Sequence, residues 1–447
     1  MASYPRLLPI RQRLIARALD DVPAAVRRAV DAAVPEGTIK QGQRIAVTAG
    51  SRGISNVALI TREVVNCIRR RGGEPFVVPA MGSHGGATAE GQAALLRDAF
   101  GISEETMGCP VLSSMEVVEL GRTQERGLPV YVDEHVARAD GVVVVNRVKA
   151  HTDYSGPHES GLFKMIAIGL GKRAQAESIH AFGAWGLRQL IPEVARAKIR
   201  LAPILGGIAI LEDGYEQTAE IVGLPAEQIE EAEPKLLEQA KQYMARLPFA
   251  ELDLLIVDWM GKEISGTGLD TNVIGRTRIE GEAEFDRPRI ERIIVRGLTE
   301  ATHGNGIGVG LADIITRRLH DAIDVRTTQI NSLTSTFPLR AVIPVVAEHD
   351  QEALDLALYL LRRKPVEEVT IARIRDTLHL GSLLVSENLL DQVRQNETVE
   401  AVGEPDEIRF DAQHNLIPAE VGPAHEPRVR MRSPQAEPSP SPKGRGE

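Results

Sequence analysis

Cysteine is nearly absent from this chain of 447 residues, which contains only Cys67 and Cys109. Two cysteines exclude a disulfide framework and a thiolate metal site, and they favour a reducing compartment, for which we expect the cytoplasm. Aromatic residues are also scarce, at 4% of the chain, whereas 43% of the residues are hydrophobic. The interior must therefore be built mainly from aliphatic side chains.

Long apolar runs and an excess of basic residues are missing as well. No run of about 18 apolar residues occurs, so no membrane span is expected. The first residues, "MASYPRLLPIRQRLIARALDD", lack the apolar centre of a signal peptide. The net charge is −10 and no basic stripe stands out, which argues against binding to nucleic acid.

Strands and helices alternate along the first half of the chain. Helices are expected over 13–34 and 56–73, and strands in "RIAVTAGS" (44–51), "PFVVPAMGSHGG" (75–86) and "DGVVVVNRVKAH" (140–151). Such alternation predicts an α/β fold with mainly parallel sheets.

A second α/β unit is expected to begin near residue 251, after a helix over 225–247. Later strands are expected in "RIERIIVRGL", "FPLRAVIPVV" and "LHLGSLLVSE", with helices at 308–322 and 350–364. We therefore predict two α/β domains, over 1–249 and 250–405, with an active-site cleft between them. Residues 406–447 are rich in Pro, Ser and charge, and we expect them to form a mostly disordered tail.

Three polar side chains follow three of the expected strands of the first domain: Arg52, His84 and His151. If these strands are neighbours, the three residues share one edge of the sheet, where open α/β sheets bind ligands. Arg52 suits a substrate carboxylate, and two histidines suit paired acid and base catalysis. The alternative is that each histidine only caps its loop.

A lysine and a further histidine lie in the segment after His151. Lys164 stands inside the apolar run "GLFKMIAIGLG", and a desolvated lysine becomes a nucleophile. The alternative is a lysine whose amine reaches the surface. His180 ends the next expected helix, and one histidine alone does not make a metal site.

The ordered set of motifs resembles a known family. Gly82-Ser83-His84, then His151, then Ser160-Gly161-Leu162-Phe163-Lys164, and His180 sixteen residues later resemble the nickel-dependent lactate racemases and related racemases and epimerases of 2-hydroxy acids.

The resemblance implies a cofactor and a role for each of these residues. The cofactor would be nickel in pyridinium-3,5-bisthiocarboxylic acid mononucleotide, the nickel-pincer nucleotide, covalently attached to Lys164 and supplied by cofactor-biosynthesis proteins. His180 would bind the nickel, and Ser160 and Gly161 would lie beside the cofactor. His84 and His151 would move the proton of the substrate hydroxyl while the C2 hydride goes to the cofactor and returns. The partner would be a small hydroxy acid, and the chain could form an oligomer.

The sequence departs from the family pattern at positions that concern the substrate. Ala49 stands where the family has an aspartate. "GTGLDTNVIGRTR" (266–278) has Ile274 and Gly275 in place of a Tyr-Gln pair, and Arg278 where a lysine is expected. We therefore predict a substrate bulkier than lactate, such as a sugar acid. Its remaining candidate contacts in this segment are Asn272, Arg276 and Arg278.

Two other kinds of function stay open at the level of the sequence. A metal-dependent hydrolase or lyase could use the histidines of one segment, His151, His158 and His180, with Asp153 and Glu159. A relative that binds the cofactor without turnover would also fit the departures at Ala49 and Gly275.

Overall fold

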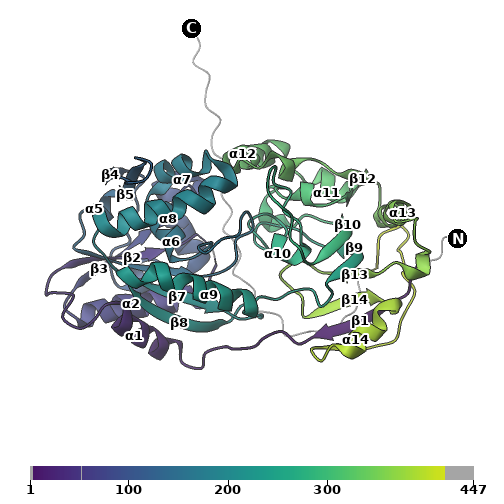
Figure 1. Ribbon diagram of the computed structural model, residues 1–447, viewed down its shortest axis with the longest axis horizontal. Helices are drawn as coiled ribbons and strands as arrows, with labels where there is room; N and C mark the ends of the chain where they lie inside the picture. The colour runs from purple at the N-terminus through teal and green to yellow at the C-terminus, as the bar shows by residue number, and fades with distance from the viewer. Residues whose placement is uncertain (1–3, 52, 418–447) are drawn as a thin grey trace, which may run out of the picture.

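The computed structural model describes residues 4–51 and 53–417, and these form two α/β domains that lie side by side (Figure 1). The first domain is built on a five-stranded sheet of order β3-β2-β6-β7-β8. The second is built on an eight-stranded sheet of order β12-β11-β10-β9-β13-β14-β1-β15. The predicted α/β fold with mainly parallel sheets is thereby confirmed.

The first four strands of the five-stranded sheet run parallel, and β8 is antiparallel to β7. The strands are β2 (Arg44–Ala49), β3 (Glu74–Pro79), β6 (Gly141–Arg147), β7 (Ile204–Glu212) and β8 (Thr218–Pro225), and a separate ribbon pairs β4 (Val117–Arg122) with β5 (Pro129–Asp133). The helices are α1 (Val22–Ala33), α2 (Val57–Arg70), α3 (Ala89–Ala94), α4 (Glu104–Met107), α5 (Glu134–Ala137), α6 (Leu162–Lys164), α7 (Lys172–His180), α8 (Gly183–Leu201) and α9 (Ile229–Tyr243).

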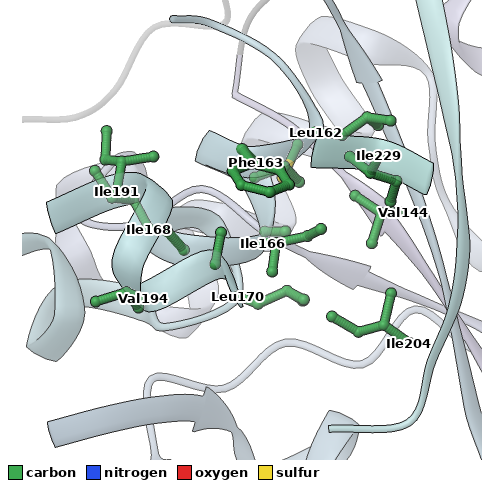
Figure 2. Close-up of a cluster of buried hydrophobic side chains, with 14 of the residues drawn as sticks. Val144, Leu162, Phe163, Ile166, Ile168, Leu170, Ile191, Val194, Ile204 and Ile229 are labelled. Carbon is green, nitrogen blue, oxygen red and sulfur yellow. The ribbon is translucent and has the colours of Figure 1, made fainter. Parts of the chain in front are cut away.

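Helices cover both faces of this sheet. The buried side chains of α1, α2 and α4 pack on one face, and those of α6 to α9 pack on the other. Figure 2 shows part of the second layer, where Leu162, Phe163 and Ile166 lie against Val144 of β6 and Ile229 of α9. The core of this domain is built mainly from aliphatic side chains, as the composition predicts.

Helix α1 begins later than the sequence pattern predicts. The Asp21 side chain accepts a hydrogen bond from the Ala24 amide at 2.8 Å, and Pro23 lies in the first turn. Both are signals of a helix start, so residues 13–21 stay outside the helix. The prediction of a helix from residue 13 is wrong for this reason.

In the second domain, β12, β11, β10, β9 and β13 run parallel, whereas β14, β1 and β15 are joined by antiparallel pairing. The strands are β1 (Leu7–Gln12), β9 (Glu251–Val257), β10 (Arg289–Val295), β11 (Ile314–Thr316), β12 (Val345–Ala347), β13 (Ile371–Ile374), β14 (Ser382–Ser386) and β15 (Val399–Ala401). The helices are α10 (Thr271–Ile274), α11 (Arg317–Asp321), α12 (Val325–Ser335), α13 (Asp350–Leu360) and α14 (Leu390–Gln395).

Two expectations for this domain are wrong in detail. The helix expected over 308–322 is split, because Ile314 and Ile315 are fully buried in the short strand β11 and only Arg317–Asp321 is helical. The strand expected in "FPLRAVIPVV" begins late, because Pro338–Ala341 forms a 3-10 turn before β12.

The first strand of the chain belongs to the second domain. Ile10 of β1 lies opposite Leu383 of β14 on one side and Ala401 of β15 on the other. Leu8 and Ile10 are buried in the core of that domain. The predicted boundary of a first domain that starts at residue 1 is therefore wrong, because β1 completes the second sheet.

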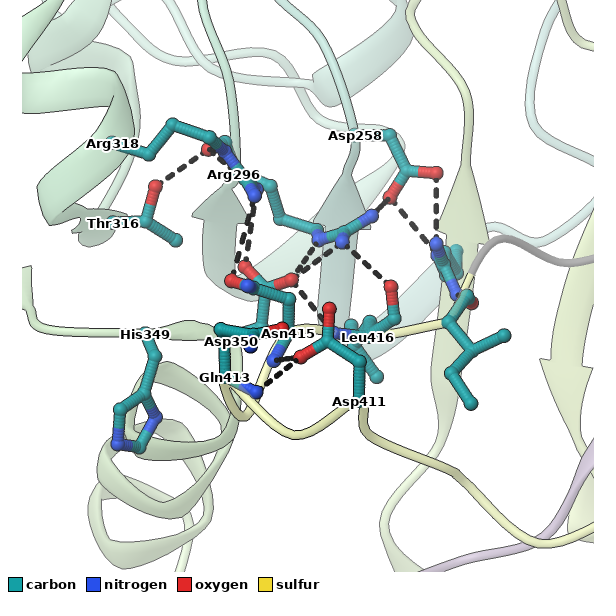
Figure 3. A network of polar contacts seen from close by, with 12 residues as sticks. Asp258, Arg296, Thr316, Arg318, His349, Asp350, Asp411, Gln413, Asn415 and Leu416 are labelled. Carbon is teal, nitrogen blue, oxygen red and sulfur yellow. Dashed lines mark hydrogen bonds and ion pairs between the residues drawn. The ribbon is translucent and has the colours of Figure 1, made fainter.

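The expected tail is likewise ordered over its first part. Leu416 is buried, and its amide donates to Asp350 Oδ2 at 2.8 Å. Arg296 donates to Asp350 at 2.9 Å, to Asp258 at 2.6 Å and to the Leu416 carbonyl at 3.1 Å, as Figure 3 shows. Residues 406–417 are thus part of the second domain, and the rest of the expected tail lies outside the described residues.

None of the helices in residues 4–51 and 53–417 combines the length and the apolar composition that crossing a membrane requires.

Candidate active site

The carboxyl ends of β3, β2 and β6 lie at one edge of the first sheet, because these strands are parallel neighbours. His84 follows β3 and His151 follows β6, so both histidines belong to loops at this edge. The condition set by the sequence, that the three strands are neighbours, is confirmed. Arg52, in the loop after β2, lies outside the described residues.

The loop that carries His84 is shaped by glycines and by one buried glutamine. Gly82 and Gly85 have φ values of 58° and 65°, in the left-handed region that glycine adopts at little cost. Gln92 Nε2 donates to the carbonyl oxygens of Gly82 and His84, at 3.0 and 3.1 Å. His84 Nδ1 lies 2.8 Å from the Met81 carbonyl oxygen, which can only accept, so the ring proton is on Nδ1. The His84 ring therefore donates through Nδ1.

The loop that carries His151 is organised by the buried carboxylate of Glu159. This carboxylate accepts from the His151 amide at 2.6 Å and from the Gly156 amide at 3.1 Å, and it pairs with Lys241 at 3.0 Å. Backbone hydrogen bonds between Lys149 and Ser160 close the loop. Glu159 is therefore a structural residue of the loop.

The side chain of Glu233, on α9, requires a glycine at position 161, directly before helix α6. It accepts from the Phe163 amide at 3.1 Å, and a Cβ atom on Gly161 would lie 2.5 Å from its carboxylate. His158 also contacts Glu233, at 3.2 Å, and its ring stacks on Phe163 with centroids 4.2 Å apart. Gly161 and His158 thus help to fix the position of helix α6, which carries Lys164.

Lys164 reaches His151 instead of the surface. Its neighbours Phe163 and Met165 are buried in the apolar layer, and its Nζ lies 2.5 Å from His151 Nε2. The other ring nitrogen, Nδ1, accepts a hydrogen bond from the Asp153 amide at 3.0 Å. Burial lowers the pKa of His151 well below 6.5, and positive charge at Lys164 lowers it further, so the ring is neutral.

The Nζ of Lys164 thus contacts an uncharged ring. A lysine amine placed in this way is the candidate nucleophile for acylation.

His180, at the end of α7, has the properties of a metal ligand. Its Nδ1 is buried and has no hydrogen-bond partner among the described residues. Burial, and then the charge of Lys164, lower the pKa of His180 to about 4, while Asp153 acts in the opposite direction. A neutral imidazole with a buried, unpartnered nitrogen suits a borderline metal ion such as nickel, so the residues fit the group implied by the motifs.

The second domain holds the loop of His151 and offers fewer substrate contacts than the sequence predicts. Asn272 Nδ2 donates to the His151 carbonyl at 3.1 Å. Arg276 donates to Asp313 at 2.8 Å and to backbone carbonyls including that of Leu311. Arg276 is therefore a structural residue of the second domain and not the expected carboxylate clamp, whereas Arg278 is exposed and pairs with Asp313 at 3.3 Å.

A conventional metal site is not assembled in residues 4–51 and 53–417. No group of three His, Cys, Asp or Glu side chains there is placed to hold a metal ion. Of the set that the hydrolase or lyase hypothesis requires, His158 and Glu159 make the structural contacts described above. The described residues therefore do not bring together the metal ligands that the hydrolase or lyase hypothesis requires.

A family model matches part of the chain. Residues 12–185 match the model of the lactate racemase N-terminal domain. This part of the chain is similar to that domain. It contains His84, His151, Lys164 and His180, and the match supports an isomerase of the racemase or epimerase kind.

The solved structures similar to this chain include the lactate racemase apoprotein from Thermoanaerobacterium thermosaccharolyticum, with 13% sequence identity and a TM-score of 0.47 over 82% of this chain and 94% of that chain. No curated protein sequence matches the chain.

Sequence reasoning missed two residues that contact the surroundings of His151 and Lys164. Arg340 of the second domain contacts the loop of His151. Its signal was a single arginine inside the apolar run "FPLRAVIPVV", which the strand interpretation did not use. Lys198 of α8 is fully buried and donates to the Ala167 carbonyl at 2.9 Å, in the π-helical segment Met165–Gly169 that follows Lys164.

Lys198 makes the stability of the protein depend on pH. Burial lowers the pKa of Lys198 to about 7, from an ordinary value of 10.5. The unfolded chain then binds the proton more tightly than the native one, so stability rises by up to about 1.4 kcal/mol per pH unit from about pH 7 to about pH 10. Replacing Lys198 with Met should remove this dependence, so the variant gains most over wild type at or below pH 7. Thermal unfolding from pH 6 to 10 measures it.

The exposed Lys235 of α9 provides the control for this experiment. A Lys235→Met variant should follow the wild-type pH dependence. A Lys198→Met variant with an unchanged pH dependence would mean that Lys198 is protonated in the native state throughout the range.

Proposed function

We propose that this protein is a racemase or epimerase of a 2-hydroxy acid bulkier than lactate. We propose further that it uses nickel in pyridinium-3,5-bisthiocarboxylic acid mononucleotide attached to Lys164. The observation that carries the proposal is the 2.5 Å contact of Lys164 Nζ with His151 Nε2, beside the unpartnered Nδ1 of His180. The match to the lactate racemase N-terminal domain supports it.

The residues divide the work of holding the cofactor. The amine of Lys164 would form the covalent bond, and the neutral ring of His180 would bind nickel. The chemistry that the group supplies when bound is reversible acceptance of the hydride from C2 of the substrate. Everything else in the reaction falls to the side chains of the protein.

The two rim histidines would handle the proton of the substrate hydroxyl. His84 would accept that proton through Nε2, since its Nδ1 donates to the Met81 carbonyl. His151 would lose its contact with the Lys164 amine once Lys164 is acylated, so its Nε2 would then face the substrate. Asp153 Oδ2, 3.8 Å from His151 Nδ1, would stabilise the imidazolium formed when this ring takes up a proton.

The charges around His151 favour an anionic substrate. Lys164 and Lys149 both lower the pKa of His151, which reflects a positive potential in this part of the site. Acylation of Lys164 removes one amine and leaves Lys149. Arg278, on the exposed side of the second domain, is the remaining candidate there for a substrate carboxylate or a second polar group.

The test uses holoprotein produced together with the cofactor-making enzymes. Single enantiomers of lactate, malate and sugar acids are incubated with it in D2O, and the products are analysed by chiral chromatography and by mass spectrometry. We expect racemisation or epimerisation of a bulkier acid, at least about tenfold more efficient than that of lactate.

Deuterium from the solvent distinguishes hydride return from proton abstraction at C2. A returned hydride keeps the original hydrogen at C2, so the product should contain no solvent deuterium at that carbon. Deuterium at C2 would mean proton abstraction from carbon and would overturn the proposed mechanism. A holoprotein that keeps nickel and the covalent group but turns over none of the acids would instead establish a cofactor-binding relative without catalysis.

A further inference from the structure

Arg340 of the second domain reaches across to the catalytic loop of the first. It lies in the turn Pro338–Ala341, and only 1% of its surface is exposed. Its Nη1 forms an ion pair with Asp153 Oδ1, and its Nη2 donates to the Thr152 carbonyl at 2.9 Å. Its Nε donates to the Thr277 carbonyl at 2.9 Å. One guanidinium thus joins a loop of the second domain to the two residues that follow His151.

Asp153 links Arg340 to the imidazole of His151. Its amide donates to His151 Nδ1 at 3.0 Å, and its Oδ2 lies 3.8 Å from the same atom. Burial disfavours the charged form of Asp153, but His151 and Arg340 beside it lower its pKa to about 2. Of these two neighbours, Arg340 carries a permanent charge and forms an ion pair with the carboxylate.

The contacts therefore form a continuous series from Arg340 to Asp153, from Asp153 to His151, and from His151 to Lys164. Arg340 and Asp153 are separated by 187 positions in the sequence, so the series exists only while the two domains are in contact. Thr271 Oγ1, at the start of α10, donates to the Thr152 carbonyl at 2.8 Å and supports the same loop.

We propose that Arg340 is a positioning residue of the active site, which aligns His151 with Lys164 by holding Asp153 and thereby makes that alignment depend on the contact between the domains. The inference rests on the proposed function only in treating His151 and Lys164 as the reacting pair. Arginine suits this role because its planar fork serves three acceptors at once, on Asp153, Thr152 and Thr277.

The proposal predicts opposite effects for the two partners of the ion pair. The groups that act on the charge of His151 are Lys164, Asp153, Lys149 and His180. Arg340→Gln removes a positive charge and releases the Asp153 carboxylate toward the ring, so the pKa of His151 should rise, by about one unit. Asp153→Asn removes the negative charge, so the pKa of His151 should fall below its wild-type value. A merely structural role would not produce shifts of opposite sign.

The measurement is made on the full-length apoprotein, which needs neither cofactor nor substrate. The ring proton of His151 is followed by NMR from pH 4 to 9 and assigned with a His151→Gln variant. The reactivity of Lys164 toward acetic anhydride is measured in parallel by peptide mass spectrometry. Acylation of Lys164 should slow by about tenfold in Arg340→Gln, because the amine loses its aligned partner.

Two further variants guard against general disruption. Arg340→Lys keeps the charge but not the fork, so the pKa of His151 should move less than in Arg340→Gln, while acylation of Lys164 still slows. Glu282→Gln breaks another ion pair between the domains, Arg188 with Glu282 at 2.6 Å, but keeps the hydrogen bond from Arg188 to the Ser155 carbonyl, and it should leave both readouts unchanged.

An unchanged pKa of His151 in Arg340→Gln, or shifts of the same sign in Arg340→Gln and Asp153→Asn, would overturn the role of Arg340. The outcome is independent of the proposed function. Opposite shifts in the apoprotein, combined with a holoprotein that racemises no acid, would keep the positioning role and reject the racemase.

Discussion

Replacing Lys164 with Ala is expected to abolish attachment of the cofactor completely. Lys164 is the amine that contacts a neutral imidazole at 2.5 Å, and it is the nucleophile proposed for the covalent bond to the cofactor. Intact-protein mass spectrometry on protein produced with the cofactor-making enzymes should show an adduct on the wild type and none on the variant. Turnover should disappear with the adduct.

Two variants complete the experiment with Lys164. Lys164→Arg keeps a long cationic side chain but has no nucleophilic amine, so it should also lack the adduct. Lys235→Ala, at an exposed position on α9, should carry the adduct at the wild-type level. An adduct that remains on Lys164→Ala would show that the cofactor is attached elsewhere, and the role of Lys164 would then be wrong.

Replacing His180 with Ala is expected to separate nickel binding from covalent attachment. The buried Nδ1 of His180 has no partner within the described residues, and its low pKa keeps the ring ready to bind a metal at neutral pH. Nickel should fall from about one per chain to a small fraction of that, with affinity reduced at least about a hundredfold. The adduct at Lys164 should remain, because the amine and His151 are unchanged.

His158 is the matched control for this metal analysis, because it belongs to the ligand set of the hydrolase or lyase hypothesis. Its ring stacks on Phe163 and contacts Glu233, so His158→Gln should leave nickel unchanged. Loss of metal in His158→Gln together with retention in His180→Ala would favour a conventional metal enzyme. Elemental analysis of the two purified variants, at equal protein concentration, distinguishes these results.

The part of the site that the sequence predicts is the part that local pattern determines. Apolar runs that end in polar residues mark β3 and β6, and these ends place His84 and His151 at one edge of the sheet. Lys164 stands out because it interrupts an apolar segment, and its contact with His151 spans only thirteen positions. Here short-range pattern and parallel topology are sufficient.

The remainder depends on contacts that no local pattern contains. The pairing of Arg340 with Asp153 requires the packing of two domains. The sequence made Arg276 a candidate substrate contact. In the folded chain its guanidinium instead donates to Asp313 and to several backbone carbonyls. Strand β1 is a short segment whose partners β14 and β15 lie near the other end of the described chain, so no local pattern assigns it to a sheet.

The position of β1 between β14 and β15 has a consequence for how the protein is made. A ribosome delivers Leu8 and Ile10 long before their neighbours around Leu383 and Ala401. The first domain has all its strands by residue 225 and can therefore fold while β1 is still unpaired. Until β14 and β15 have been made, the nascent chain thus carries an unpaired apolar strand ahead of the first domain, and this strand must remain accessible so that it can insert last.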